Sequence, residues 1–358
     1  MVIRVAIAGV GNCASALVQG VEYYKNVKSE FEVPGLMHVF LGKYHVRDIE
    51  FVAAFDVNRL KIGRDLSEAI FVEPNCCEKF VEVPKLGVDV LPGPILDTVA
   101  PHMKGPFRAY NSEEIEPADV TKVLLDRKAD MLVNFLPVGS FHGARYYAKA
   151  CLDAGCAFIN CMPEFIASDH AWSERFKEQG VPIAGDDIKS QIGATILHRS
   201  IINLLVSRGV KIDKTYQLNV GGNTDFLNMI CENRLKTKRI SKTEALTSLI
   251  PYNVDAWAGP SGHIPHLGDT KICYLHINGR KFGNTRVSID LKLTVEDSPN
   301  SAGMVIDVIR AVKLALDRGI AGPLISISAY AFKHPPQQVP DHLARQWVKE
   351  FIQGKRER

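Results

Sequence analysis

Two carboxylates and a lysine stand close together in the stretch GDDIKS, which covers Gly185–Ser190. The apolar runs before and after it predict a buried strand and an amphipathic helix. In an open α/β sheet, ligands bind beyond the carboxyl ends of the strands, which is where this stretch falls. A lysine that is buried or placed beside another cation has a lowered pKa and can move protons near neutral pH. GDDIKS is therefore a candidate site, with the alternative that Asp186 or Asp187 only caps the helix.

A second chemical signal is the stretch GVGNCA at residues 9–14. It fits the pattern G-x-G-x-x-G/A between a predicted strand at 2–8 and a predicted helix at 12–24. Glycines let the backbone approach a pyrophosphate, and the free N–H groups and dipole at the helix start attract the anion. We predict a dinucleotide site here, with a plain tight turn as the alternative. The predicted loop residues are Gly9, Gly11, Asn12, Cys13 and Ala14.

The ribose of such a cofactor needs an acidic partner near the end of the second strand. Asp56 lies near the end of the predicted strand 51–57, which favours NAD over its 2′-phosphorylated form. Arg59 nearby weakens that preference. Asp56 stands farther along the chain than the usual ~20 residues, because residues 25–48 form a predicted insertion in the first crossover.

Strands and helices alternate through the first part of the chain. This alternation predicts an α/β fold with a Rossmann-like, doubly wound parallel sheet. The predicted strands are 2–8, 51–57, 131–139, 157–162 and 181–185. The predicted helices are 12–24 and 143–155, and residues 59–70 are predicted to form a loop and a short helix.

The pattern changes after about residue 212. Residues 215–223 and 271–297 alternate with a period of two, and turns are predicted at Asn278-Gly279 and Gly283-Asn284. These signals are typical of an antiparallel sheet. A long apolar helix follows at 301–320 and is expected to pack back on the first sheet.

Composition narrows the classes of function. The chain has 358 residues, 46% of them hydrophobic, and a formal net charge of +3, so neither a nucleic-acid nor a membrane partner is expected. No secretory leader is expected, and no apolar run approaches the ~20 residues of a membrane helix. Eight cysteines without a CxxC pair indicate a cytoplasmic protein rather than a disulfide framework or a cysteine metal cage.

Six stretches, taken in order along nearly the whole chain, resemble myo-inositol-1-phosphate synthases of the shorter bacterial and archaeal branch. Each motif alone is weak, whereas six in one order are highly specific. They are VAIAGVGNCASALVQGVEYY, VPGLMHVFLGKYHVRDIEFVAAFDV, GDDIKSQIGAT, LNVGGNTDFLNM, EDSPNSAGMVIDVIRA and AYAFKHPP.

The resemblance implies an inositol-3-phosphate synthase (1L-myo-inositol 1-phosphate synthase), the first step of inositol and inositol-phospholipid biosynthesis. In this family glucose 6-phosphate is cyclised with bound NAD and no net redox change. The C5 hydroxyl is oxidised, a C6 proton is removed, the enol attacks the C1 aldehyde, and the C5 ketone is reduced again. Such chemistry needs a hydride acceptor, proton shuttles, and cations that hold the phosphate and the enolate.

The resemblance also implies which side chains catalyse, namely Lys189, Lys271 and Lys333, with Asp187 and Asp297 beside them. The alternative for Lys189 is a solvent-exposed lysine at a helix start, and Lys271 taken alone would be interpreted as a strand-edge lysine. The eukaryotic branch reads KSGQTK where this chain reads KSQIGAT. One lysine of that branch is therefore missing, and its role must be filled by another group, such as a cation or water.

The implied cofactor-binding residues extend beyond the glycine loop. Several stand at predicted strand ends in LPVGS and GGNTD, where the alternative is a simple turn. Helix caps are the alternative for Asp65 and Ser298, and surface roles are the alternative for Tyr147 and Lys238. The set comprises Asp56, Asp65, Pro137, Val138, Gly139, Tyr147, Ser190, Asn223, Asp225, Lys238 and Ser298.

Two domains are expected. Residues 1–205 and 300–358 would form the NAD-binding domain, and residues 206–299 a catalytic and tetramerisation domain that in this family builds a homotetramer. A divalent or monovalent cation held by phosphate and carboxylates belongs to the same expectation. The pair His263 and His266 has no third ligand at suitable spacing, so a metal there is not expected.

Two other functions use the same features. An NAD-dependent dehydrogenase of a sugar phosphate or polyol would bind NAD in the same loop but would release NADH. An inactive NAD-sensing or scaffold protein would need no catalytic group. The lysines favour the cyclase, because a simple dehydrogenase needs one acid–base residue and an inactive protein needs none.

Overall fold

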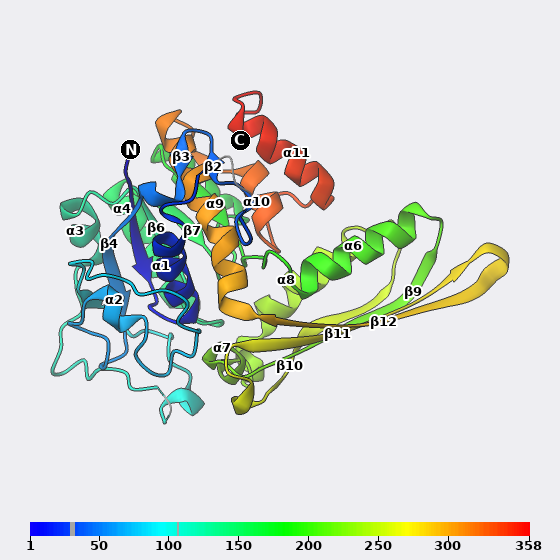
Figure 1. The fold of residues 1–358 in the computed structure, drawn as a ribbon, viewed down its shortest axis with the longest axis horizontal. Helices are drawn as coiled ribbons and strands as arrows, with labels where there is room; N and C mark the ends of the chain where they lie inside the picture. The colour runs from blue at the N-terminus through cyan, green and yellow to red at the C-terminus, as the bar shows by residue number, and fades with distance from the viewer. Residues whose placement is uncertain (29–32, 106) are drawn as a thin grey trace.

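The computed structural model describes residues 1–28, 33–105 and 107–358. Two large sheets dominate it: a seven-stranded sheet in the body of the molecule and a four-stranded sheet that extends away from it as a long arm (Figure 1). The predicted α/β class, with a Rossmann-like sheet and a second sheet, is confirmed. Among the described helices, none has the length and apolar character needed to cross a membrane.

The seven-stranded sheet is parallel throughout, with the order β13-β8-β7-β6-β1-β4-β5. The chain runs from β1 outward to β4 and β5 and then returns to β6 on the other side of β1. This reversal creates a crevice at the carboxyl ends of β1 and β6, where such folds bind ligands. The strands are Ile3–Ala8 (β1), Ile49–Asp56 (β4), Val90–Pro92 (β5), Met131–Asn134 (β6), Ala157–Asn160 (β7), Pro182–Gly185 (β8) and Gly322–Pro323 (β13).

Helices cover both faces of this sheet. On one face α1 and α9 pack together over a core that includes Leu17, Val305 and Ile309. On the other face α3, α4 and α5 pack around Leu124, Ala148 and Phe176. The prediction that a long apolar helix returns to the first sheet is confirmed by α9. The helices of the body are Asn12–Tyr24 (α1), Leu66–Ala69 (α2), Val120–Asp126 (α3), Phe141–Ala154 (α4), His170–Glu178 (α5), Asp297–Asp317 (α9), Ile325–Ala331 (α10) and Asp341–Ile352 (α11).

The four-stranded sheet has the order β10-β9-β11-β12, and α6 and α8 pack on one of its faces. β11 is antiparallel to β9 and β12, as predicted, whereas β10 is parallel to β9. The parallel pair arises because the chain from β9 to β10 crosses over through α7 and α8. The elements are Ala194–Ser207 (α6), Lys211–Gly221 (β9), Thr224–Asn228 (α7), Lys236–Thr247 (α8), Asp255–His263 (β10), Thr270–Lys281 (β11) and Thr285–Glu296 (β12).

One local prediction is corrected. Asn278-Gly279 is not a turn, because β11 continues to Lys281 and the hairpin turns at the predicted Gly283-Asn284. The register with β9 shifts at this point, which marks a bulge. A Cβ on Gly279 would lie 2.7 Å from the Lys211 carbonyl oxygen, so the close approach of the strands there requires glycine. The loop and short helix predicted at 59–70 are confirmed, and the helix is α2.

The predicted insertion at 25–48 lies between α1 and β4. It contains the short hairpin Phe40–Leu41 (β2) and Tyr44–His45 (β3). Residues 29–32 of the insertion lie outside the described residues.

Candidate active site

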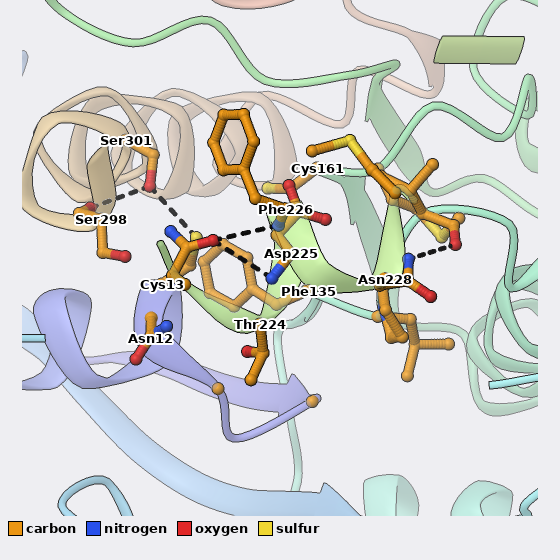
Figure 2. A pocket seen from close by; sticks show the side chains of 18 of the residues that line it. Asn12, Cys13, Phe135, Cys161, Thr224, Asp225, Phe226, Asn228, Ser298 and Ser301 are labelled. Carbon is orange, nitrogen blue, oxygen red and sulfur yellow. Dashed lines mark hydrogen bonds between the residues drawn. The ribbon is translucent and has the colours of Figure 1, made fainter. Parts of the chain in front are cut away.

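A cavity lies where the carboxyl ends of the first sheet meet α7, α8 and the start of α9 (Figure 2). Its lining extends from Gly9 in the loop after β1 to Lys333 after α10. Figure 2 shows Asn12 and Cys13 on one side of this space and Thr224, Asp225 and Phe226 opposite. The fold therefore brings together motifs that are more than three hundred residues apart in the chain.

The glycine loop has the geometry of a phosphate cradle. Gly9 has a φ of +90°, and a Cβ there would lie 2.8 Å from the Phe135 carbonyl oxygen, so only glycine fits. Gly11 lines the cavity, and a Cβ there would project into open space. α1 begins after Gly11 without a side-chain cap, which leaves its first amides available to an anion. These residues fit the pyrophosphate of a dinucleotide.

Asp56 closes β4 beside that loop. Its Oδ2 accepts a hydrogen bond from the Val10 amide at 2.7 Å, and its Oδ1 accepts one from the Asn58 amide at 2.7 Å. Each oxygen keeps a lone pair for a ribose hydroxyl. Arg59 pairs with Glu114 on the surface and does not line the cavity. The arrangement therefore fits NAD better than a 2′-phosphorylated cofactor.

Other predicted cofactor residues also line the cavity. The loop after β6 contributes Pro137 and Val138, α4 contributes the buried Tyr147, and the segment after β8 contributes Ser190. These residues come from neighbouring parallel strands and the helix between them, whose ends meet at one edge of the sheet.

Asn223, just before α7, and Ser298, in the first turn of α9, line the same cavity. Asn223 Oδ1 accepts from the Asp225 amide at 3.1 Å, and its Nδ2 donates to Asp269 Oδ1 at 3.0 Å. Ser298 Oγ donates to the same Asp269 oxygen at 2.7 Å. Burial raises the pKa of Asp269 to about 6. The sequence analysis missed Asp269, which stands two residues before the predicted catalytic Lys271.

Lys271 and Asp297 form an ion pair in the cavity lining. Lys271 Nζ lies 2.8 Å from Asp297 Oδ1 and 6.0 Å from the ring centre of Phe226. Burial alone would raise the pKa of Asp297, but the ammonium group of Lys271 outweighs it, and the pKa is lowered. Lys271 lies at the start of β11 and Asp297 at the start of α9, so the end of the second sheet positions this pair.

Asp187 holds two further lysines. Its Oδ1 lies 2.8 Å from Lys238 Nζ and 3.0 Å from Lys333 Nζ, and its Oδ2 accepts from Ser241 Oγ. Burial would raise the pKa of Asp187, but Lys238 and Lys333 outweigh it and hold that pKa well below its usual range. Burial and the neighbouring cations lower the pKa of Lys333 to about 8 although Asp187 opposes them.

Lys242 is a fourth cavity lysine that the sequence analysis missed. It is 6% exposed, and among the described residues no carboxylate forms an ion pair with it. Burial, and then the charges of Lys271, Lys238 and Lys333, lower its pKa well below the ordinary value. The spacing of Lys238 and Lys242, one helical turn apart on α8, was the signal that could have found it.

Lys189 does not face the cavity, which corrects its predicted catalytic contact. Its side chain is fully buried, and its Nζ donates to the Ala329 carbonyl oxygen at 2.9 Å and lies 3.2 Å from Asp341 Oδ1. The ammonium group is therefore held between α10 and α11. The alternative of an exposed helix-start lysine is wrong as well, because α6 begins only at Ala194.

Three predicted cofactor residues also lie away from the cavity. Ala14 is buried in the core under α1. Asp65 caps α2 through the Ser67 amide, which was its alternative interpretation. Gly139 is covered by Arg234, whose Cβ would lie 2.7 Å from a Cβ on the glycine. Each is adjacent to the cofactor loops but points its backbone or side chain elsewhere.

The alternative interpretation as helix caps is wrong for Asp186, Asp187 and Ser298. Asp186 accepts hydrogen bonds from the amides of 166–168, and α6 begins after Gly193, so neither Asp186 nor Asp187 caps it. Ser298 lies inside the first turn of α9, whose capping position is Glu296. Within residues 1–28, 33–105 and 107–358, no three His, Cys, Asp or Glu side chains group as metal ligands do.

Comparisons with known proteins agree with this geometry. A family model described as myo-inositol-1-phosphate synthase matches residues 193–298. The chain is 52% identical to an inositol-3-phosphate synthase of Corynebacterium glutamicum, over 98% of both chains. It is also 52% identical to one of Mycobacterium tuberculosis, over 98% of this chain and 96% of the relative.

Solved structures show the same fold. A crystal structure of Ari2 has a TM-score of 0.78 and 34% identity, over 99% of both chains. A myo-inositol-1-phosphate synthase-related protein from Thermotoga maritima has a TM-score of 0.83 over 99% of both chains, and at 24% identity it supports the fold alone.

The parallel sheet, the glycine loop and the lysine-lined cavity define a dinucleotide-dependent α/β enzyme. The chain belongs to the myo-inositol-1-phosphate synthase family, as identity over nearly its full length shows. The family predicted from the sequence is thereby confirmed, together with its enzyme class, an NAD-dependent isomerase that makes inositol 3-phosphate.

Proposed function

We propose that this protein cyclises glucose 6-phosphate to inositol 3-phosphate in the cavity described above. The observation that carries the proposal is the gathering of four lysines, Lys238, Lys242, Lys271 and Lys333, in one cavity beside a phosphate-cradling loop. A phosphosugar that is enolised and closed into a ring needs several cations at once, for its phosphate and for the enolate oxygen.

NAD, when bound by the glycine loop and Asp56, supplies the reversible removal of a hydride from C5. The protein's own task is then to hold the phosphate and to move protons. Lys238 stays charged, because Asp187 and Asp225 outweigh the effect of burial and raise its pKa. We assign Lys238 and Lys271, each held by a carboxylate at 2.8 Å, to the phosphate and the enolate oxygen.

Lys242 is the side chain best suited to accept the C6 proton. A lysine whose pKa is lowered well below its ordinary value gives up its proton more readily and can act as a general base at its Nζ. The neighbouring lysines cause part of this lowering, so the same cluster that binds anions also prepares the base. Lys242 thereby fills the role left open by the lysine that is missing from KSQIGAT.

A dehydrogenase of a sugar phosphate or polyol is the alternative function. A purified sample is incubated with glucose 6-phosphate and NAD far below the substrate concentration. The cyclase account expects inositol phosphate to exceed the NAD supplied, as seen by phosphorus NMR, with no lasting absorbance of NADH. If NADH rises in step with substrate loss and no cyclic product forms, the protein is a dehydrogenase instead.

The catalytic efficiency is expected to fall at alkaline pH. Lys333, with its pKa lowered to about 8, is charged below that pH and loses its proton above it. The substrate phosphate is already a dianion there, because its second pKa is about 6. We expect kcat/KM to fall about tenfold per pH unit above pH ~8, and Lys333→Arg to move this limb upward. A flat profile to pH ~10 in the wild type would show that Lys333 need not be charged.

A homotetramer and the two-domain division belong to the same proposal. The open face of the four-stranded sheet carries Tyr216, Leu218, Trp257 and Tyr274, which are 37–45% exposed. Leu218 lies opposite Tyr274 in the register, so these side chains form one apolar patch on residues 206–299. A second copy is a fitting cover for such a patch.

Replacing Tyr274 with glutamate is expected to break the tetramer into smaller species, because it places a charge in the apolar patch. Light scattering coupled to gel filtration measures the mass. Leu125→Glu is the matched control, since Leu125 is a 54% exposed leucine on α3 of the first domain. Leu125→Glu should remain a tetramer. A tetramer that persists in Tyr274→Glu would contradict the assignment.

A bound cation is also part of the proposal. Asp269 is buried and Asp225 is partly buried; desolvation raises the pKa of both carboxylates, and Asn223 contacts both residues. A cation beside the NAD phosphates would let these carboxylates ionise. For the compartment we propose the cytoplasm, which the eight free cysteines support.

A further inference from the structure

The fully buried Lys189 and Arg199 share one carboxylate, that of Asp341. Lys189 Nζ lies 3.2 Å from Asp341 Oδ1, and Arg199 Nε lies 2.7 Å from Asp341 Oδ2. We call these three residues the Asp341 cluster. None of them lines the cavity, and the mechanism above gives them no part in the chemistry. Burying two cations against one carboxylate is costly unless the geometry is well satisfied, so the cluster calls for an explanation.

Lys189 connects Asp341 to the segment that carries Lys333. Its Nζ donates to the carbonyl oxygen of Ala329 at 2.9 Å, in the last turn of α10, where a cation is favourable. Its backbone amide donates to Ala331 at 2.8 Å, and the Lys333 amide donates to Asp187 at 2.7 Å in the same short ladder. The ammonium group of Lys189 thereby fixes the end of α10, from which Lys333 projects.

Arg199 connects Asp341 to the helix that carries Lys238 and Lys242. Its Nη1 donates to the Ala245 carbonyl oxygen on α8, one turn after Lys242. Its Nη2 donates to the Val339 carbonyl oxygen at 2.8 Å, just before α11. Arg199 stands on α6, so one guanidinium group joins α6, α8 and the start of α11.

We propose that the Asp341 cluster is a positioning device that sets the spacing between the lysines of α8 and Lys333. Among the residues that the structure describes, only Asp341 forms ion pairs with both buried cations, and Asp341 is the first residue of α11. α11 packs beside α10 (Figure 1). The C-terminal helix thereby helps to assemble the active site although it contributes no lining residue.

This inference rests on the proposed function, and it explains why Lys189 stands in the GDDIKS motif without facing the cavity. Burial lowers the pKa of Lys189 to about 8, and Asp341 opposes that shift. Without the carboxylate, Lys189 and Arg199 would repel each other. Their hydrogen bonds to the end of α10 and to α8 would then weaken. A displacement of about 1 Å between reacting groups costs up to roughly a hundredfold in rate.

The test replaces Asp341 with asparagine, which keeps the shape and removes the charge. We expect kcat to fall about 10- to 100-fold, while KM for glucose 6-phosphate and the Kd for NAD change by less than about threefold. Asp341→Glu should recover much of kcat, because it restores a carboxylate. Glu350→Gln is the matched control, since Glu350 lies on the same helix but contacts Gln346 and Arg356 rather than the buried cations; it should leave kcat unchanged.

Lys189→Met removes only the link between Asp341 and α10, because Asp341 keeps Arg199 as its partner. We expect the two substitutions to be strongly non-additive in kcat, as members of one network are. Hydrogen exchange supplies a readout that does not depend on turnover: the Lys333 amide and the end of α8 should exchange faster in Asp341→Asn than in Glu350→Gln.

The outcomes separate the two claims. A wild type that does not cyclise glucose 6-phosphate refutes the proposed function, and the exchange result still decides the cluster. An active wild type together with unchanged kcat in both folded variants overturns the cluster's role. A loss of kcat that only matches the loss of NAD-binding protein overturns it as well, and if Asp341→Asn does not fold, Lys189→Met decides.

Discussion

Lys271→Ala is expected to lose nearly all turnover while it still binds NAD. Removing one preorganised charge that stabilises an oxyanion costs roughly 10²- to 10³-fold in kcat. Lys271 lies 2.8 Å from Asp297, so its loss also leaves a partly buried carboxylate in the cavity without its paired cation. The glycine loop is untouched, and its cradle for the pyrophosphate remains.

Steady-state assays of inositol phosphate check the loss of turnover, and calorimetric titration with NAD checks that the cofactor still binds. Lys281→Ala is the matched control, because Lys281 stands on the same strand and its Nζ bonds only to the exposed Thr285 Oγ1 at 2.9 Å. If Lys271→Ala keeps a rate near that of the control, Lys271 is not catalytic.

Gly11→Val is expected to lose NAD instead. The valine side chain would enter the open space over the start of α1, which the pyrophosphate needs. Losing two charge-assisted hydrogen bonds of roughly 1.5–3 kcal/mol each weakens binding by at least about a hundredfold. Turnover should fall with it, and high NAD should restore part of the rate.

A matched control separates cofactor loss from a general effect of valine. Gly262 lies in β10, and a Cβ there also meets open space, yet it is remote from the cofactor loop. Gly262→Val should bind NAD normally. Normal NAD affinity in Gly11→Val, measured by calorimetry, would refute the assignment of the loop.

Much of the fold follows from local patterns. The alternation of strands and helices predicts the first sheet, because each βαβ unit must bury its strand on both faces. Local pattern does not decide pairing between distant strands. Asn278-Gly279 has the composition of a hairpin turn, but in the structure it lies inside β11, opposite a bulge in β9 where Asp213 is the extra residue.

Some cavity residues could be predicted from their motifs, whereas others depend on contacts between distant segments. Asp187, Lys271 and Lys333 stand in motifs, and the structure places them on the cavity. Lys242 stands in the charged run KTKRISK, which reads as a solvated helix face until the second sheet buries it. Lys189 reads as a site residue from its motif, yet its side chain faces Asp341. Only tertiary packing tells these two lysines apart.

The central claim is a transient oxidation at C5 within one active site. It is tested most directly with glucose 6-phosphate that carries deuterium at C5 and with NAD far below the substrate concentration. We predict inositol phosphate that retains the deuterium at the carbon derived from C5, as seen by mass spectrometry and NMR, because the same hydride returns before release. A cyclic product without that deuterium, or labelled NADH that accumulates in solution, would contradict the account.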